Sequence, residues 1–491
     1  MQYEYTRDSR AFAATTNDGM RRRASISKLP PSMHGDISAA KMSEHELSDA
    51  VFAITSPSTS ANGFISHTWK DNAMDKYLAL CSYLHLFRAV FFGWLCWLIF
   101  VLFLAAKYGL TGMGGFTWLK TYFLLIPSAG FFVAFFFANS IPWLGSTQRW
   151  WLDKLCIHQT RTSWKLAGVK QLPKFCDKSE QLIILWSEEY FSRLWCCCEL
   201  ATFSANHKLD AIKLQPLWLA PWILSTILVD IACSFIVSHL LDVYFAMFIE
   251  MYPTWGSIPA LMISFSGYAP AIVPNLISFR AKARAHKNLI EQLENFDLKS
   301  CKCAVESDRE HVEDHVNHLW GSLDKFNAMV RTDFHDIVVS SVGDASFMPL
   351  SLAVLPFLPL FWSAAADILG CDGGPCDEVA VVEGVGEGWR LVVTIFLEWS
   401  MCIIWSPFIY PTMFLALSYT EQFESLAVRN LLGSLAIFVP YVFYLGFLGG
   451  IGSSLAASAM IVGGWWAVFA PMYFMFAVVI VGYVQYRGHG H

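Results

Sequence analysis

Charged residues are scarce in this sequence. Of its 491 residues, 34 are Lys or Arg and 40 are Asp or Glu, so charged residues make up 15% of the chain. A soluble globular chain contains about a quarter. Hydrophobic residues make up 55%. This composition excludes an ordinary soluble protein and predicts an integral, multi-pass membrane protein that carries a soluble part.

Other absences exclude further classes of protein. The net charge of -6 gives no basic surface for nucleic acid, so no nucleic-acid partner is expected. The first apolar run of sufficient length begins near Phe87, which predicts that there is no N-terminal signal peptide. The 13 cysteines show no repeated metal-ligand spacing. They predict mostly reduced thiols on the cytosolic side and no bound metal.

Apolar runs predict the membrane-spanning segments. Two of them, at residues 87–106 and 122–142, predict a membrane hairpin whose two ends lie on one side of the bilayer. Lys and Arg are dense on both sides of this hairpin, so the positive-inside rule predicts cytoplasmic termini and cytoplasmic soluble parts. The sequence does not indicate which membrane is occupied. The remaining runs bring the expected total to about eight spans, and they lie near residues 217–239, 244–265, 347–369, 389–414, 431–451 and 459–483.

The predicted organisation interleaves soluble and membrane segments. Because the hairpin returns the chain to the cytoplasm, the two soluble pieces that flank it can form one domain. The polar, aperiodic N-terminal region is predicted to be disordered. The predicted segments are a disordered tail at 1–61, the first part of an α/β domain at 62–86, the membrane hairpin at 87–142, the second part of the domain at 147–215, membrane spans at 216–279, a cytosolic helical segment at 280–345, further spans at 346–484 and a C-terminal tail at 485–491.

The two soluble pieces alternate between strands and helices. Strands are predicted from Gly63 onward and at residues 150–152, 181–186 and 211–214, with a helix near 172–178 that has Pro173 in its first turn. A further helix is predicted to follow residue 186. The alternation is typical of a doubly wound α/β sheet. The predicted fold class is therefore an α/β cytosolic domain joined to a polytopic α-helical transmembrane domain.

The stretch 187–203, SEEYFSRLWCCCELATF, contains the most informative pattern. Ser187 is a suitable N-cap for a helix in which Glu199 lies among aromatic residues and cysteines. Burial of a carboxylate in such surroundings is expected to raise its pKa. A catalytic acid or base and a structural ion pair are both made in this way.

Three motifs, which occur along the chain in the order of the family's own elements, resemble the Toll/interleukin receptor (TIR) domain. Tyr-x-x-Arg-x-Trp-Cys-x-x-Glu-Leu, from Tyr190 to Leu200, resembles the third-helix signature, particularly that of plant-type TIR domains. GFISHTW at 63–69 is similar to the first TIR strand, and WWLDKLCIHQ at 150–159 is similar to the second. The resemblance implies a flavodoxin-like fold, truncated here because the chain returns to the membrane near Pro216, before the fifth strand and helix.

The resemblance implies two roles for the domain. In NAD-cleaving TIR domains the Glu of this signature is catalytic, which implies that Glu199 is catalytic, that NAD is the substrate and that no cofactor is needed. Residues that follow strands lie where open α/β sheets bind ligands, and a tryptophan one turn before Glu199 shares its helix face. The predicted substrate-binding residues are Ser66, His67, Trp69, Asp153 and Trp195. The alternative is a scaffold that signals by self-association or adaptor contacts, in which Glu199 pairs with Arg193 or Lys154.

Two acidic residues in the apolar runs suggest a third class of function. Asp230 and Glu398 have no Lys or Arg nearby in the same run, and intramembrane carboxylates often mark ion paths. The alternative function is therefore an ion or solute transporter with a regulatory TIR-like domain. Cys371 and Cys376 lie across a Gly-Gly-Pro turn in a predicted outer loop. They predict a disulfide, with two unpaired thiols as the alternative.

Two further patterns invite local predictions. Three arginines at 21–23 precede Ser25, which predicts either a phosphorylation site or a basic tail near anionic lipid. His311, His315 and His318 share one face of a predicted helix. That face predicts a solvated or domain-docking surface in preference to a metal site.

Overall fold

The computed structural model describes part of the chain in two compact units. The α/β unit comprises Met1–Ala89, Val133–Pro221 and Arg284–Val342, and the helical unit comprises Val90–Phe132, Trp222–Ala283 and Gly343–His491. The described residues are 5–8, 49, 52, 56–57, 60–108, 119–141, 148–158, 160–236, 272–303, 306–343, 352, 354–359, 361–362, 409, 412–413, 415–417, 419–420, 422–441 and 443.

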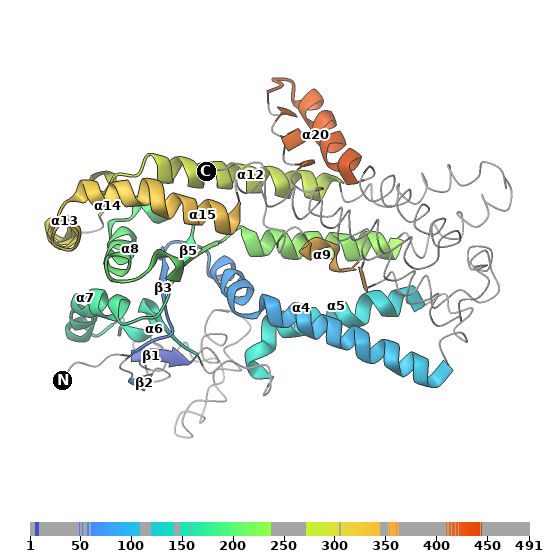
Figure 1. The fold of residues 1–491 in the computed structure, drawn as a ribbon, viewed down its shortest axis with the longest axis horizontal. Coiled ribbons are helices and arrows are strands. Elements are labelled where there is room, and N and C mark those ends of the chain that lie inside the picture. Colours follow the sequence, from blue (N-terminus) through green and yellow to red (C-terminus); the bar gives the residue numbers. More distant parts are fainter. Residues whose placement is uncertain are drawn as a thin grey trace, which may run out of the picture. The chain divides into compact units, whose positions relative to one another are not determined.

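Four parallel strands form the centre of the α/β unit (Figure 1). Their order is β4-β3-β5-β6. Every residue of β3 and β5 is buried, as expected for parallel strands that are covered on both faces. The predicted α/β class is therefore confirmed. The strands are β3 Gly63–His67, β4 Arg149–Leu152, β5 Leu182–Trp186 and β6 Ile212–Pro216.

Two short strands extend this sheet beyond β4. The first, β1 (Tyr5–Asp8), pairs antiparallel with β4, and β2 (Ser56–Pro57) pairs antiparallel with β1. Both lie in the tail that was predicted to be disordered, most of which is outside the described residues. The exposed edge of β4 supplies backbone partners, so polar residues without a periodic pattern still form strands there.

Helices surround the sheet, and several of them come from the segment at 306–342. That segment contributes Val316, Phe326 and Phe334 to the same hydrophobic core as the strands, so it belongs to the α/β unit. The helices of this unit are α6 Asp153–Cys156, α7 Thr162–Asp177, α8 Leu194–Asn206, α13 Ser307–Trp320, α14 Leu323–Met329 and α15 His335–Val342, with shorter turns η2 Ala138–Ser140, η3 Tyr190–Ser192, η4 Leu209–Ala211, η7 Leu298–Ser300 and a π-helical turn η8 Val330–Phe334.

Two predicted details of the helices are wrong. Ser187 does not cap α8, because η3 intervenes and α8 begins at Leu194 after Arg193, whose backbone is extended. The extended geometry follows from pairing with Lys302, since the Leu194 N–H donates to the Lys302 carbonyl at 3.1 Å. Pro173 lies inside α7 and not in its first turn, because that helix begins at Thr162.

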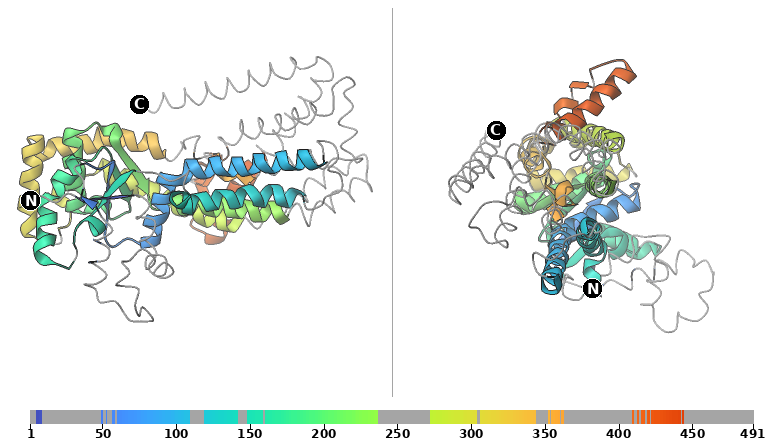
Figure 2. Two further views of the ribbon diagram at one scale, coloured as in Figure 1. Left: turned by 90° about the horizontal axis from the view of Figure 1, so that it is seen from below. Right: turned by 90° about the vertical axis from the view of Figure 1, so that its right-hand side faces the viewer.

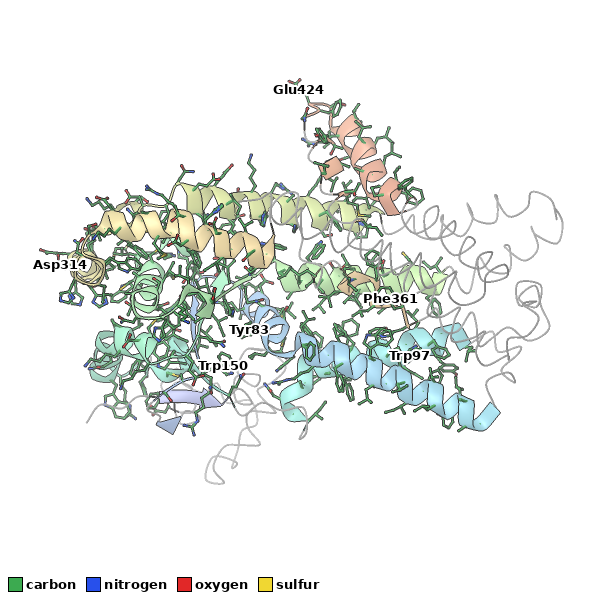
Figure 3. All side chains as sticks on the ribbon, viewed as in Figure 1. Tyr83, Trp97, Trp150, Asp314, Phe361 and Glu424 are labelled. Atoms are coloured by element: carbon green, nitrogen blue, oxygen red, sulfur yellow. The ribbon has the colours of Figure 1, made fainter. Side chains whose placement is uncertain are left out.

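The first part of α4 (Ala73–Tyr108) packs against the sheet. The rings of Tyr83 and Trp150, labelled in Figure 3, meet edge to face with centroids 6.0 Å apart. The Tyr83 hydroxyl also donates to Gln181 Oε1 at 2.7 Å. On β3, the Phe64 ring stacks on Trp151 of β4 at 4.4 Å. These contacts hold α4 and β3 against β4 and the residue before β5.

Two of the described helices are long and apolar enough to cross a membrane. They are α4 (Ala73–Tyr108) and α5 (Leu119–Phe137), which lie side by side in Figures 1 and 2, with the Phe100 and Phe123 rings 5.0 Å apart. Shorter described helices are α9 Leu219–Ile236 and α20 Leu426–Tyr441, with η9 Leu355–Phe357, and α12 Ile272–Glu294 runs through residues of both units. The predicted span 217–239 falls on α9 and 431–451 falls partly on α20, both shorter apolar helices. The other predicted spans lie largely outside the described residues, so the count of eight remains a prediction.

Candidate active site at the carboxyl edge of the sheet

Three chain segments bring polar side chains to one edge of the sheet. Ser66 and His67 are the last residues of β3, Asp153 directly follows β4, and Ser187 directly follows β5. Parallel strands end at the same edge, where open α/β sheets bind ligands. Helix α8 contributes Glu199 to this edge.

Glu199 is held by a hydroxyl. The Ser66 hydroxyl donates a hydrogen bond to Glu199 Oε2, and the Tyr190 hydroxyl lies 2.7 Å from Ser66 Oγ. All three side chains are buried, with exposed fractions of 1% for Ser66, 0% for Tyr190 and 8% for Glu199. The carboxyl group is therefore fixed in position by groups that carry no charge.

The pKa of Glu199 is raised well above its ordinary value. Burial is the largest cause, and the like charge of Asp153 adds to it, while the hydrogen bond from Ser66 acts in the opposite direction. The carboxyl group therefore keeps its proton at a higher pH than an exposed Glu would. The sequence predicts a shift in the same direction.

No ion pair involves Glu199 among the side chains that the structure describes. Arg193, one of the two predicted partners, instead pairs with Glu189 at 3.2 Å. The other predicted partner is Lys154, whose side chain lies outside the described set. The predicted pairing of Glu199 with Arg193 is therefore wrong, because Arg193 belongs to the extended link before α8 and not to the buried face of that helix.

A second group of side chains gathers around Asp153. The Trp69 indole donates a hydrogen bond to Asp153 Oδ2, and His67 Nε2 lies 3.8 Å from Asp153 Oδ1. Trp69 is 51% exposed, whereas His67 is 7% exposed. Because Asp153 also raises the pKa of Glu199, the two groups are electrostatic neighbours. Four of the predicted substrate-binding residues thus lie together with the predicted catalytic residue.

The fifth predicted substrate-binding residue has a different neighbour. The Trp195 indole donates to Asp308 Oδ2 of α13 at 3.4 Å, and its ring packs against the core. Asp230, predicted to mark an ion path, lies on the apolar helix α9 of the helical unit. The remaining predicted sites, Ser25, Cys371, Cys376 and Glu398, lie outside the described residues.

The predicted histidine face of α13 contacts α8. His315 Nε2 lies 3.1 Å from the Thr202 hydroxyl, and Trp320 donates to the Ala201 carbonyl at 3.0 Å. In the part of the chain that the structure describes, no three His, Cys, Asp or Glu side chains are arranged to hold a metal ion. His315 therefore takes part in docking one helix on another.

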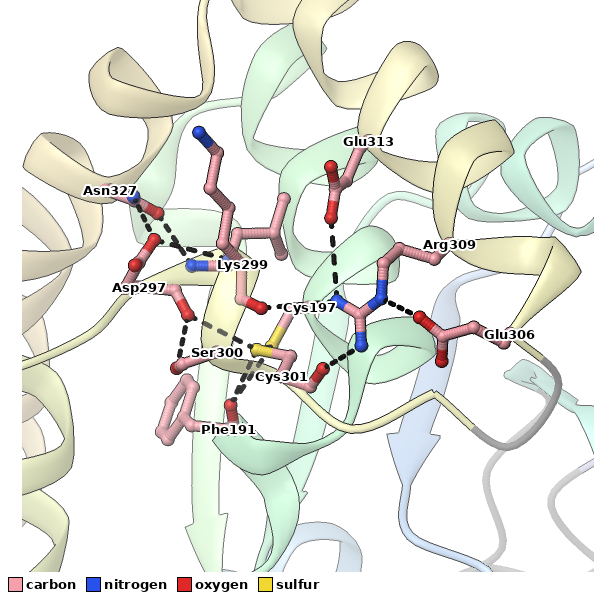
Figure 4. A network of polar contacts seen from close by, with 11 residues as sticks. Phe191, Cys197, Asp297, Lys299, Ser300, Cys301, Glu306, Arg309, Glu313 and Asn327 are labelled. Carbon is pink, nitrogen blue, oxygen red and sulfur yellow. Dashed lines mark hydrogen bonds and ion pairs between the residues drawn. The ribbon is translucent and has the colours of Figure 1, made fainter.

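Arg309 fixes the loop before α13 beside α8, as Figure 4 shows. Its guanidinium donates to the carbonyl oxygens of Lys299 at 3.2 Å and Cys301 at 3.0 Å, and pairs with Glu306 at 2.6 Å. In the same segment, the thiol of Cys301 lies 3.7 Å from the thiol of Cys197 on α8. The cysteine run at 196–198 is buried and serves as packing.

Tyr190 is the site residue to which sequence reasoning gave no role. It was visible as the first position of the pattern that ends with Glu199, but its partner Ser66 is 124 positions away. Comparison with family models, curated proteins and solved structures found no match to this chain. The chemistry must therefore be inferred from the site itself. The buried carboxyl group of Glu199 can transfer a proton or stabilise a positive charge, and a planar ligand can stack on the exposed ring of Trp69.

Proposed function

We propose that this chain is a membrane-anchored signalling protein whose α/β unit is a truncated TIR-like domain. Numbered along the chain, its four parallel strands have the order 2-1-3-4, which is the order of flavodoxin-like sheets. The motif at 63–69 contains β3, the motif at 150–159 contains most of β4 and all of α6, and the motif at 190–200 contains η3 and the first part of α8. About eight spans anchor the domain in a lipid bilayer with both termini in the cytoplasm.

The reaction proposed for the domain is cleavage of NAD through Glu199. The bond between the ribose and nicotinamide breaks, its electron pair leaves with the nicotinamide nitrogen, and the cationic sugar is stabilised by the ionised carboxylate. Water then adds to the sugar carbon and releases a proton. Trp69 is placed to stack on a ring of the substrate, and Asp153 orients Trp69 through their hydrogen bond.

One observation carries this proposal: Glu199 is bonded to the hydroxyl of Ser66 and to no described cation. A carboxylate that served only as a structural ion-pair partner would face Arg or Lys, because leaving it unpaired in the core is costly. A carboxylate that stabilises the short-lived sugar cation must instead have no Arg or Lys paired with it, because such a partner would already neutralise its charge. Self-association of the domain is proposed as the means by which the signal is passed on.

The test is NAD consumption and nicotinamide release by the purified full-length chain in detergent. We expect turnover by the wild type and its loss in Glu199→Gln, which keeps the size of the side chain but cannot ionise. Glu294→Gln is the matched control, since Glu294 is an exposed carboxylate of the same unit. Self-association without turnover by the wild type would replace the enzyme with a scaffold, and ion flux in vesicles would favour the transporter alternative.

A further inference from the structure

Ser66 stands between two other oxygen groups in a single hydrogen-bonded line. Its Oγ contacts Glu199 Oε2 on one side and lies 2.7 Å from Tyr190 Oη on the other. Tyr190 Oη also lies 3.4 Å from the carbonyl oxygen of Cys196. Each hydroxyl carries one proton and can both donate and accept, so the line can be ordered in two directions.

Each direction suits one charge state of Glu199. When the carboxyl group is ionised, Tyr190 donates to Ser66 and Ser66 donates to Glu199. When it is protonated, Glu199 donates to Ser66, Ser66 donates to Tyr190, and Tyr190 donates to the Cys196 carbonyl. In both cases every buried hydroxyl has an acceptor, which avoids the cost of an unsatisfied polar group in the core.

We propose that Ser66 and Tyr190 form a reversible hydroxyl relay that positions Glu199, gives each of its charge states a hydrogen-bond partner and stabilises the carboxylate more than the neutral acid. The proposal rests on the catalytic role of Glu199 given above and deepens it. Ser66 and Tyr190 act through Glu199 and are positioning residues. The relay solves a conflict in the site, because burial favours the neutral acid whereas stabilisation of a cationic sugar requires the carboxylate.

Among the side chains that the structure describes, the neighbours of Glu199 leave the relay as the main source of stabilisation for its carboxylate. Burial raises the pKa of Tyr190 well above its usual range, so the phenol keeps its proton. Burial likewise raises the pKa of the facing thiols, that of Cys198 to about 12 and those of Cys176 on α7 and Cys196 on α8 well above the ordinary value. These thiols stay neutral. Asp153 on α6 is the remaining acidic neighbour, and its charge opposes ionisation of Glu199.

The experiment is an infrared titration of the Glu199 carboxyl group in the full-length protein, run beside the pH profile of NAD turnover. The Glu199 band is the pH-dependent carboxylic-acid signal that Glu199→Gln lacks. In Ser66→Ala we expect its midpoint to move up by about one pH unit, because a hydrogen bond to the charged carboxylate is stronger by about that amount than the bond made by the neutral acid. Tyr190→Phe should move it in the same direction by less. Turnover should fall about tenfold in kcat in Ser66→Ala at a pH well below both midpoints, with KM unchanged.

Two variants serve as controls for folding and for the hydroxyl itself. Ser66→Thr keeps the hydroxyl and should restore the wild-type midpoint. Ser204→Ala removes a buried hydroxyl of α8 that bonds only within its own helix, to the Leu200 carbonyl at 2.6 Å and the Ala201 carbonyl at 3.5 Å, and should leave the midpoint in place.

The two readouts separate this inference from the proposed function. A shifted midpoint in Ser66→Ala without NAD turnover by the wild type would keep the relay and reject the hydrolase. An unshifted midpoint in folded Ser66→Ala would reject the relay, even if NAD is cleaved. A shift in Ser66→Ala but none in Tyr190→Phe would limit the relay to one hydroxyl and overturn the role of Tyr190.

Discussion

The thiols of Cys197 on α8 and Cys301 after η7 lie 3.7 Å apart, although 104 positions separate them in the chain. Their exposed fractions are 0% and 1%. The Cys301 thiol also donates to the Phe191 carbonyl at 3.2 Å, and the Cys197 thiol contacts the same oxygen at 3.5 Å. The residues that follow α12 therefore pack onto the predicted TIR-like part and complete its core.

This burial predicts the order in which the thiols react. Cys197 and Cys301 should resist a water-soluble maleimide in the native protein, because both are inaccessible and burial raises the pKa of Cys197 well above its usual range. Cys303, which is only partly buried, should react before both of them. Mass spectrometry of labelled peptides checks the order. Rapid labelling of Cys301 before unfolding would contradict the packing of this segment on α8.

Truncation of Phe326 should destabilise the sheet, although Phe326 lies more than a hundred residues after β6. Its ring is fully buried and lies 5.7 Å from the Phe296 ring. Phe326→Ala should cost about 3–5 kcal/mol. Hydrogen exchange of the β5 amides measures the loss. The exposed Lys325 provides the control, Lys325→Ala, and unchanged β5 protection in Phe326→Ala would mean that the helices form an independent domain.

Gly63 should not tolerate a methyl group. A Cβ at this position would meet the Trp150 indole, with Cε3 at 2.6 Å, and the two residues are paired in the β3–β4 register. Gly63→Ala should therefore lose about 1–3 kcal/mol through overpacking. Denaturant unfolding of the single variants and of Gly63→Ala/Trp150→Leu makes a double-mutant cycle. Additive effects would show that the indole does not occupy this space.

The stability of the α/β unit should depend on pH through Glu199. The folded-state pKa lies above the ordinary 4.5, so the native state binds this proton more tightly than the unfolded state. The contribution is complete below 4.5 and is lost as the pH rises toward the folded pKa, at about 1.4 kcal/mol for each unit of difference. Wild-type stability should thus fall relative to Glu199→Gln as the pH rises. Parallel denaturation curves at all pH values would contradict the raised pKa.

The proposed topology predicts opposite protection of two tags. In sealed vesicles with the cytoplasmic face outward, a tag placed after Met113, in the predicted outer connection of the hairpin, should survive protease. A tag at the C-terminus should be digested, because the positive-inside rule assigns that end to the cytoplasm. An odd number of spans between the two tags places them on opposite sides of the membrane. Protection of both tags would mean that an even number separates them, which would reject the eight-span count.

Local pattern was sufficient for the central strands. The sequence predicted β4 and β5 within a residue of their observed ends and the start of β3 at Gly63, because buried parallel strands are rich in apolar residues. The start of α8 was misplaced, since a long-range backbone pair between Arg193 and Lys302 overrides the capping preference of Ser187. Such a pair leaves no local signal in the sequence.

The same division holds for the candidate site. The sequence by itself determined the apolar hairpin, the alternating strands and helices, and a carboxylate at Glu199 inside an apolar helix whose burial raises its pKa. Only the tertiary structure decided which side chain forms a hydrogen bond with that carboxylate. Helical spacing placed Trp195 beside it, but the sheet brings Ser66 to it across 133 positions. Propensity and periodicity act over a few residues, whereas the partner of a buried side chain is chosen by packing of the whole core.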